Sequence, residues 1–184
     1  SEKQRRFLDG YFKNEIYPIL TPQAIDPGHP FPTISNTSLN FIVQLLSRDG
    51  VNRFARLKCP NNISRFVFIP RNKEAKTYAS LGFNANDSDI ILLEDLIAEY
   101  LGSLFPGNTV VNAGLFRITR NTDVEIEEDE ADDLLEAVKD LVEQRRFGDV
   151  VRLEIAHGTA KELSAFLTER LGMQPFQIYR GKGP

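Results

Sequence analysis

The chain is poor in the residues that form disulfides, metal sites and membrane spans. It has one cysteine, two histidines and no tryptophan among 184 residues. A single cysteine, Cys59, cannot form a disulfide within the chain, and no apolar run reaches the roughly 18 residues of a transmembrane helix. The sequence also begins without a signal-like segment. We therefore expect a cytoplasmic protein.

Several catalytic sequence motifs are absent as well. The sequence contains no Gly-x-x-x-x-Gly-Lys phosphate loop, no Gly-x-Gly-x-x-Gly, no Cys/His metal spacing and no serine elbow. An acidic stretch, 123–133, lacks the turn glycine and the closing glutamate of an EF-hand. Carboxylates gathered at the N-terminus of a helix explain this stretch. The sequence therefore predicts neither a common nucleotide-binding motif nor a metal site.

The charge is unevenly distributed along the chain. The net charge is −4, with +3 in the first 58 residues and −7 in the last 64. A general nucleic-acid binder needs a basic face, so we expect no nucleic-acid partner. With 41% hydrophobic residues, the chain can bury an ordinary core and form one domain.

A proline-rich strap, defined here as residues 21–40, is the least ordinary part of the sequence. Half of the ten prolines lie in or beside it, at positions 18, 22, 27, 30 and 32. Proline fixes its own φ and disfavours helix in the residue before it, so the strap is predicted to be extended and stiff, with a turn at 26–28. Ile25, Phe31 and Ile34 are expected to be buried.

The first half of the chain is predicted to hold helices and antiparallel strands. Apolar residues at helical spacing predict a helix over 2–17, which Pro18 ends. Alternation predicts a strand over 39–45 with one buried face, and Asp49-Gly50 predicts a hairpin to a return strand, 51–58. Arg56 and Lys58 are interpreted as two solvated charges on that strand. Further elements are a strand at 65–70, a polar loop at 71–89, a strand at 90–93 and a helix at 94–105.

The second half alternates strands with helices. Strands are predicted at 110–119, where Gly114 interrupts the pattern, at 150–156 and at 176–179. Helices are predicted at 129–147 and after a capping box of Thr159 and Glu162, the last helix ending at Gly172. Helices between strands allow parallel neighbours in this half. The predicted fold class is α+β: a mixed β-sheet with an antiparallel hairpin in the first half and helices packed on the sheet.

His29 is the first candidate for chemistry. With Asp26 nearby, it could act as a base oriented by a carboxylate, as in a small hydrolase. Alternatively, rigid prolines on both sides suit a structural brace that locks the turn, and this alternative is favoured. His157 is predicted to be a loop residue at a strand end.

Arginines at the end of the 110–119 strand form the second candidate. Arg117 or Arg120 could contact phosphate oxygens, with Asn121 following at the strand end. The alternative is a salt bridge from these arginines to the acidic helix start or to a neighbouring subunit. The sequence leaves both interpretations open and favours the salt bridge.

Six blocks of sequence resemble the middle, or head, domain of bacterial polyphosphate kinases. They are TPQAIDPGHPFP, followed by ISNTSLN, then FARLKCP, IILLEDLIAEYLGSLFPG, FRITRNTDVEIEEDEADDLLEAV and RRFGDVVRLE. The motif residues that carry the resemblance in the strap are Asp26, His29, Pro30, Phe31, Asn36 and Asn40. The chain starts inside a predicted helix and stops after a predicted strand, so we expect an excised piece: residues 1–17 end a linking helix from a preceding domain, and residues 18–184 form the middle domain.

The resemblance also implies a function for the parent enzyme. Members of the family transfer the terminal phosphate of ATP to polyphosphate, reversibly, through a phosphohistidine and with Mg²⁺. Neither His29 nor His157 matches the phosphorylated position, so the resemblance implies no catalytic residue, no metal and no bound cofactor in this domain.

Its implied role is subunit association and the shape of a channel. The implied partners are the other domains, further copies of the chain, and polyphosphate and ATP in the parent. The implied location is cytoplasmic, with peripheral contact to the inner membrane for the parent. The alternative is an independent protein-binding module that uses the strap.

Overall fold

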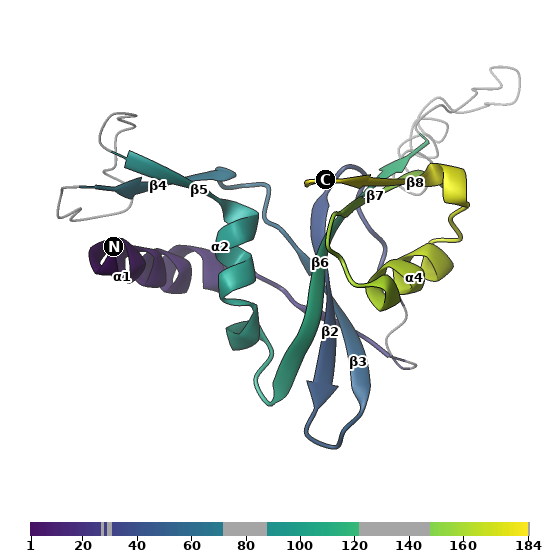
Figure 1. The fold of residues 1–184 in the computed structure, drawn as a ribbon, viewed down its shortest axis with the longest axis horizontal. Coiled ribbons are helices and arrows are strands. Elements are labelled where there is room, and N and C mark those ends of the chain that lie inside the picture. Colours follow the sequence, from purple (N-terminus) through teal and green to yellow (C-terminus); the bar gives the residue numbers. More distant parts are fainter. Residues whose placement is uncertain (27, 29–30, 72–87, 122–147, 184) are drawn as a thin grey trace, which may run out of the picture.

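The chain folds around one six-stranded sheet, and a smaller two-stranded sheet forms an arm beside it (Figure 1). The computed structural model describes residues 1–26, 28, 31–71, 88–121 and 148–183. The six-stranded sheet has the order β1-β3-β2-β6-β7-β8, and β4 and β5 form a separate two-stranded sheet. The strands are β1 Gln23–Ile25, β2 Leu39–Ser47, β3 Asn52–Lys58, β4 Phe66–Pro70, β5 Ser88–Leu92, β6 Asn108–Arg120, β7 Val150–Ala156 and β8 Ile178–Gly181. This mixed sheet with packed helices confirms the predicted α+β class.

The described helices are short and lie on both sides of the main sheet. They are α1 Glu2–Tyr11, the π-helical turn η1 Phe12–Ile16, the 3-10 turn η2 Tyr17–Ile19, α2 Leu93–Glu99, the 3-10 turn η4 Leu101–Leu104, α4 Lys161–Arg170 and the 3-10 turn η5 Pro175–Gln177. The predicted helix over 2–17 is therefore present, but only its first ten residues are α-helical. None of the described helices is long and apolar enough to cross a membrane.

The predicted hairpin is confirmed. β2 and β3 pair antiparallel, with Phe41 opposite Leu57, and Gly50 in the turn has a φ of 79° that glycine adopts without steric cost. The prediction that β2 buries one face is wrong, because Asn40 and Ile42 on its other face are also fully buried. The strap covers that second face, and a single strand pattern does not reveal such a cover.

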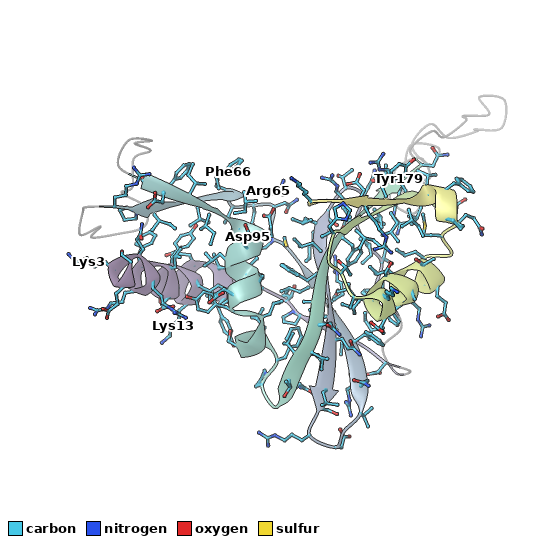
Figure 2. The ribbon with its side chains drawn as sticks, in the orientation of Figure 1. Lys3, Lys13, Arg65, Phe66, Asp95 and Tyr179 are labelled. Atoms are coloured by element: carbon cyan, nitrogen blue, oxygen red, sulfur yellow. The ribbon has the colours of Figure 1, made fainter. Side chains whose placement is uncertain are left out.

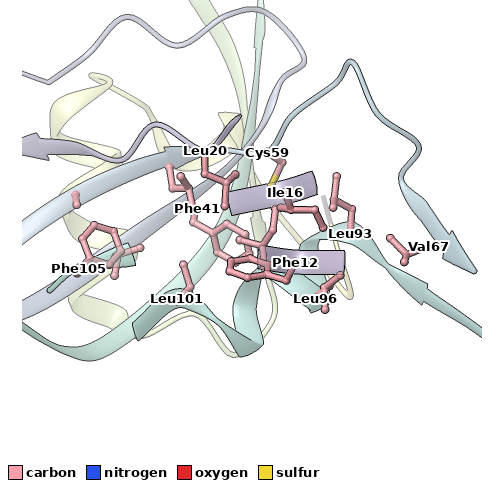
Figure 3. Packing of buried hydrophobic residues seen from close by; sticks show 14 of the residues in the cluster. Phe12, Ile16, Leu20, Phe41, Cys59, Val67, Leu93, Leu96, Leu101 and Phe105 are labelled. Atoms are coloured by element: carbon pink, nitrogen blue, oxygen red, sulfur yellow. The ribbon is translucent and has the colours of Figure 1, made fainter. Parts of the chain in front are cut away.

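The first core lies on the face covered by the N-terminal segment and α2. Figure 3 shows Phe12, Ile16 and Phe41 packed together at its centre. The Phe12 ring stacks on Tyr100 with centroids 4.3 Å apart, which ties η1 to the C-terminal end of α2. Each fully buried aromatic or aliphatic side chain of this kind stabilises the fold by about 1.5–3 kcal/mol.

The second core lies on the opposite face, under the strap and α4. Its buried members are Ile25, Ile34, Ile42, Phe116, Ile118, Leu153, Ile155, Leu163, Leu167 and Met173. The predictions that Ile25 and Ile34 are buried are thus confirmed, with exposed fractions of 7% and 0%. Phe31 is partly buried and meets Phe166 of α4 edge to face.

The predicted strand at 65–70 is present as β4, but it pairs with β5 rather than extending the main sheet. α2 ends at Glu99, earlier than the predicted helix of 94–105, and continues after Tyr100 as a 3-10 turn. Most of the predicted loop over 71–89 and the predicted helix over 129–147 fall on residues that the structure does not describe.

The sequence pattern suggested that Gly114 interrupts the strand. That prediction is wrong, because β6 runs through Gly114 without a break. A Cβ atom at position 114 would lie 2.4 Å from Cγ2 of Thr159. Glycine is therefore needed because the start of the α4 segment packs directly on the strand. The predicted capping box of Thr159 and Glu162 is also wrong, since Ala160 is the N-cap and makes no side-chain cap bond.

The C-terminal strands are partly parallel. β7 pairs antiparallel with β6, whereas β8 pairs parallel with β7 after the α4 crossover. Gly172 ends the helical segment with a φ of 64°, as predicted. The last strand starts at Ile178, later than the predicted 176, because residues 175–177 form a 3-10 turn that leaves Phe176 exposed.

Candidate functional site

The strap has hydrogen bonds both within itself and to the main sheet. The backbone N–H of Gly28 donates to Oδ1 of Asp26 at 2.8 Å, which forms the predicted turn. Further along, the N–H of Thr37 donates to the carbonyl of Ile118 at 2.9 Å. His29 and Pro30 lie outside the described residues, so the pairing of Asp26 with His29 stays a prediction.

Arg120 acts as a clamp on the strap. Its Nε donates to the carbonyl of Ile34 at 3.0 Å, its Nη1 donates to the carbonyl of Gly148 at 2.7 Å, and its backbone N–H donates to Oδ1 of Asn36 at 2.9 Å. These contacts join the strap to β6 and to the start of the β7 segment. The next residue, Asn121, donates its backbone N–H to the carbonyl of Asp149 at 2.8 Å.

A polar cluster, in which Asn40 and Arg56 are buried and Gln23 is exposed, ties the strap to β3. It consists of Gln23, Asn40 and Arg56, one side chain from each of β1, β2 and β3. Nε of Arg56 donates to Oδ1 of Asn40 at 2.8 Å, and Nη1 donates to Oε1 of Gln23 at 2.6 Å. Arg56 is only 6% exposed, so the interpretation of it as a solvated charge is wrong. Burial lowers the pKa of Arg56 from its ordinary value.

The uncovered part of the sheet carries a chain of ion pairs. Nε and Nη2 of Arg117 both donate to Oε2 of Glu154, at 3.0 and 2.6 Å, and Nε of Arg152 lies 2.8 Å from Oε1 of the same carboxylate. The guanidinium of Arg152 also stacks on the Tyr179 ring, 3.9 Å from its centroid. The partner of Arg117 is thus a residue of the adjacent strand β7, which neither of the sequence-based salt-bridge alternatives had named.

Arg117 also lines a pocket of about 420 Å³ where β2 begins and β3 ends. We call it the junction pocket, because it lies between the main sheet and the β4–β5 arm. Its lining residues are Ser35, Asn36, Thr37, Ser38, Leu39, Lys58, Cys59, Pro60, Asn61, Ile63, Arg65, Leu93, Glu94 and Arg117. Figure 2 shows Arg65 at the inner end of the arm, on the side that faces the C-terminal strand.

The charged groups of the junction pocket differ in how fully they are paired. Nε of Arg65 donates to Oε1 of Glu94 at 2.7 Å, and its Nη2 contacts the same oxygen. Lys58 has only one side-chain contact among the described residues, with its Nζ 3.4 Å from Oγ of Ser35. Its charge is therefore available to an anion in the pocket.

Cys59 closes the wall of the pocket and is chemically protected. The thiol is 6% exposed, and burial, with a further contribution from the Glu94 carboxylate, raises the pKa of Cys59 to about 12. A thiol with such a pKa stays protonated at neutral pH and is a poor nucleophile. Among the described residues, no group of three or more His, Cys, Asp or Glu side chains could hold a metal ion.

The structure brings together only some of the residues that the sequence singled out. Arg117 lines the junction pocket, whereas Arg120 and Asn121 engage backbone groups of neighbouring segments. Sequence reasoning missed Lys58 and Arg65 as members of one pocket. The signal was weak, because Lys58 ends β3 whereas Arg65, seven positions later, precedes β4 of the other sheet.

A family model described as the polyphosphate kinase middle domain matches residues 3–184. The polyphosphate kinase of Mycobacterium leprae is 41% identical over 184 residues, which cover 99% of this chain and 25% of that protein. The polyphosphate kinase of Thermosynechococcus vestitus is 40% identical over 183 residues, which cover 98% of this chain and 24% of that protein.

The crystal structure of polyphosphate kinase from Porphyromonas gingivalis has a similar fold, with a TM-score of 0.71 at 19% identity. The match covers 100% of this chain and 24% of that one. The chain thus spans about a quarter of the length of the relatives it matches. It belongs to the polyphosphate kinase family, in which it corresponds to the middle domain.

Proposed function

We propose that this chain serves as the association and channel-shaping domain of an enzyme that transfers the terminal phosphate of ATP reversibly to polyphosphate. The observation that carries the proposal is the match to the middle-domain model over 3–184, together with relatives about four times as long. The phosphohistidine, the bound ATP and the Mg²⁺ that offsets phosphate charge would then belong to other parts of the parent. In that parent, residues 1–17 would link this domain to a preceding one, and the enzyme would be cytoplasmic.

An exposed apolar face supports a role in association. Phe66 and Ile90 are 53% and 56% exposed, although both lie in strands of the β4–β5 sheet. Phe66 pairs with Leu92, and Phe68 pairs with Ile90, so alternation puts these four residues on one face of the arm. The opposite face buries Val67 and Ile69. Contiguous exposed apolar groups of this kind mark interaction surfaces.

Light scattering coupled to size-exclusion chromatography tests this role. We expect the 184-residue chain to self-associate, and we expect the double variant Phe66→Ser, Ile90→Ser to be monomeric because it loses apolar contact area. Val51→Ser is the matched control, since Val51 is 48% exposed on the β2–β3 hairpin, away from the arm. A wild-type chain that is monomeric at all concentrations would contradict the proposal.

The same preparation addresses catalysis. Incubated with ATP and Mg²⁺, the 184-residue chain is expected to form no polyphosphate, because the reactive histidine is proposed to lie elsewhere. Measurable turnover, or phosphate bound to His29 or His157, would contradict this division of labour.

The strap is less suited to the alternative of an independent binding module. Ile34 is fully buried, and Asn36 and Thr37 are hydrogen-bonded to β6. A strap that is committed to its own sheet in this way offers a partner few unpaired groups.

A further inference from the structure

We propose that the junction pocket binds phosphoryl groups of an inorganic oligophosphate. The choice of phosphoryl groups among oxyanions rests on the proposed function; the existence of an anion site rests on the charges of the pocket itself. The cations that would meet the ligand are Lys58, Arg65 and Arg117, which line the pocket, and Arg152, which lies beside Arg117 on β7.

The local charge is positive in a chain whose net charge is −4. Among the described residues, the pocket and the adjoining ion-pair chain contain four cations, Lys58, Arg65, Arg117 and Arg152, and two carboxylates, Glu94 and Glu154. The group therefore carries an excess of two positive charges. Such an excess within a concave surface attracts anions more strongly than the same charges on a flat one.

Lys58 is the cation with the least compensation. Within the part of the chain that the structure describes, no carboxylate lies within ion-pair distance of its Nζ, and its contact with Ser35 is a long hydrogen bond at 3.4 Å. A lysine ammonium is a compact point charge that binds phosphate oxygens without a fixed geometry. It can therefore turn from the Ser35 hydroxyl towards an anion at little cost.

Arg117 offers the second point of contact. Its Nε and Nη2 converge on one oxygen of Glu154, while the other oxygen of that carboxylate serves Arg152. One negative charge is thus shared by two guanidinium groups. Nη1 of Arg117 has no hydrogen bond to any described residue, and the Arg117 side chain is 35% exposed. This Nη1 edge is a donor that a phosphoryl oxygen can accept.

The remaining wall of the pocket is suited to a polar ligand. Hydroxyl and amide groups of residues 35–38 and of Asn61 line it, and Glu94 is the one carboxylate among its described lining residues. Its volume of about 420 Å³ lies within the roughly 300–1,000 Å³ typical of ligand sites. Because the cations lie on different elements, a ligand with several charged units can meet more of them than a single phosphate can. Affinity should therefore rise with the number of phosphoryl groups.

Calorimetric titration of the 184-residue chain with tripolyphosphate at low salt tests the site. We expect saturable binding that is tighter than binding of orthophosphate. Lys58→Gln should lower the affinity for tripolyphosphate by at least about fivefold, because losing one hydrogen bond to a charged group reduces affinity by about that factor or more. The matched control is Lys161→Gln, which removes the same charge from an exposed position on α4 and should change the affinity less than about twofold.

A second variant guards against loss by misfolding. Arg117→Lys keeps the charge but removes the second donor edge, so it should weaken tripolyphosphate binding while the circular dichroism spectrum and melting temperature stay close to those of wild type. Absence of saturable binding, or equal losses in Lys58→Gln and Lys161→Gln, would overturn the site. A chain that self-associates but does not bind tripolyphosphate would refute the pocket alone and leave the proposed association role standing.

Discussion

Two cationic side chains that are close in the sequence have opposite environments in the fold. Arg56 and Lys58 are two positions apart on β3 and point to the same side of the sheet. Arg56 is buried and hydrogen-bonded to Asn40 and Gln23, whereas Lys58 lines the junction pocket and has one long hydrogen bond, to Ser35. The hydrogen-bond partners that the fold supplies, rather than residue type, decide which cation is structural and which can meet a ligand.

The physical reason is the cost of removing a charge from water. A buried guanidinium is stabilised by hydrogen bonds; Nε and Nη1 of Arg56 have partners at 2.8 and 2.6 Å, whereas its buried Nη2 has none among the described residues. A partly exposed ammonium or guanidinium keeps its hydration and needs no such partner. Substitutions in the polar cluster should therefore affect stability, and substitutions in the pocket should affect mainly binding.

The largest effect is expected for Asn40→Ala. It removes the acceptor of the Arg56 Nε hydrogen bond at a position that is fully buried, leaving a charged donor unsatisfied. We expect the free energy of unfolding to fall by about 3 kcal/mol, measured by urea denaturation. Asn112→Ala is the control, because the amide of Asn112 bonds the neutral Gln44 at 2.8 Å and is only part-buried; its loss should be about 1 kcal/mol or less. Equal losses would show that burial of Asn40 and Arg56 does not matter.

An intermediate effect is expected for the pH dependence of stability that Cys59 causes. Cys59 lines the junction pocket, so this prediction tests whether water reaches its thiol. The pKa of the thiol is raised to about 12 in the fold, from an ordinary value of 9.0. Above pH 9 the unfolded chain loses this proton while the folded chain keeps it, so stability should decrease as the pH rises.

The wild-type free energy of unfolding should fall up to about 1.4 kcal/mol per pH unit more steeply than that of Cys59→Ala between pH 9 and pH 11. Parallel pH profiles for the two proteins would mean that water reaches the thiol. Tyr11 and Tyr100, which are partly buried and whose pKa values are also raised, are present in both proteins, so their contribution cancels in this comparison.

The smallest effect is expected for Arg117→Ala. Its side chain is 35% exposed, and Glu154 keeps its contact with Arg152 at 2.8 Å after the substitution. Exposed ion pairs contribute less than about 1 kcal/mol, so thermal and urea unfolding should change little. A loss as large as that of Asn40→Ala would place Arg117 in the structural framework instead of the pocket.

The local elements were predictable because their signals are local. Alternating apolar residues identified β2, the Asp49-Gly50 turn identified the hairpin, and Gly172 identified the end of the last helical segment. Contacts between distant segments were not predictable. The approach of Thr159 to Gly114, the hydrogen bonds of buried Arg56 and the pairing of Arg117 with Glu154 each join residues that are 16 or more positions apart in the chain.

The sequence by itself determined the family, through its six resembling blocks, and the α+β class, because hydrophobic periodicity acts over a few residues. Only the tertiary structure decided where the strap lies, which cations are buried and which line a pocket. Burial is a property of the assembled layers: Arg56 and Lys58 carry the same charge on the same strand, and the hydrogen-bond partners of Arg56 lie 16 or more positions earlier in the chain.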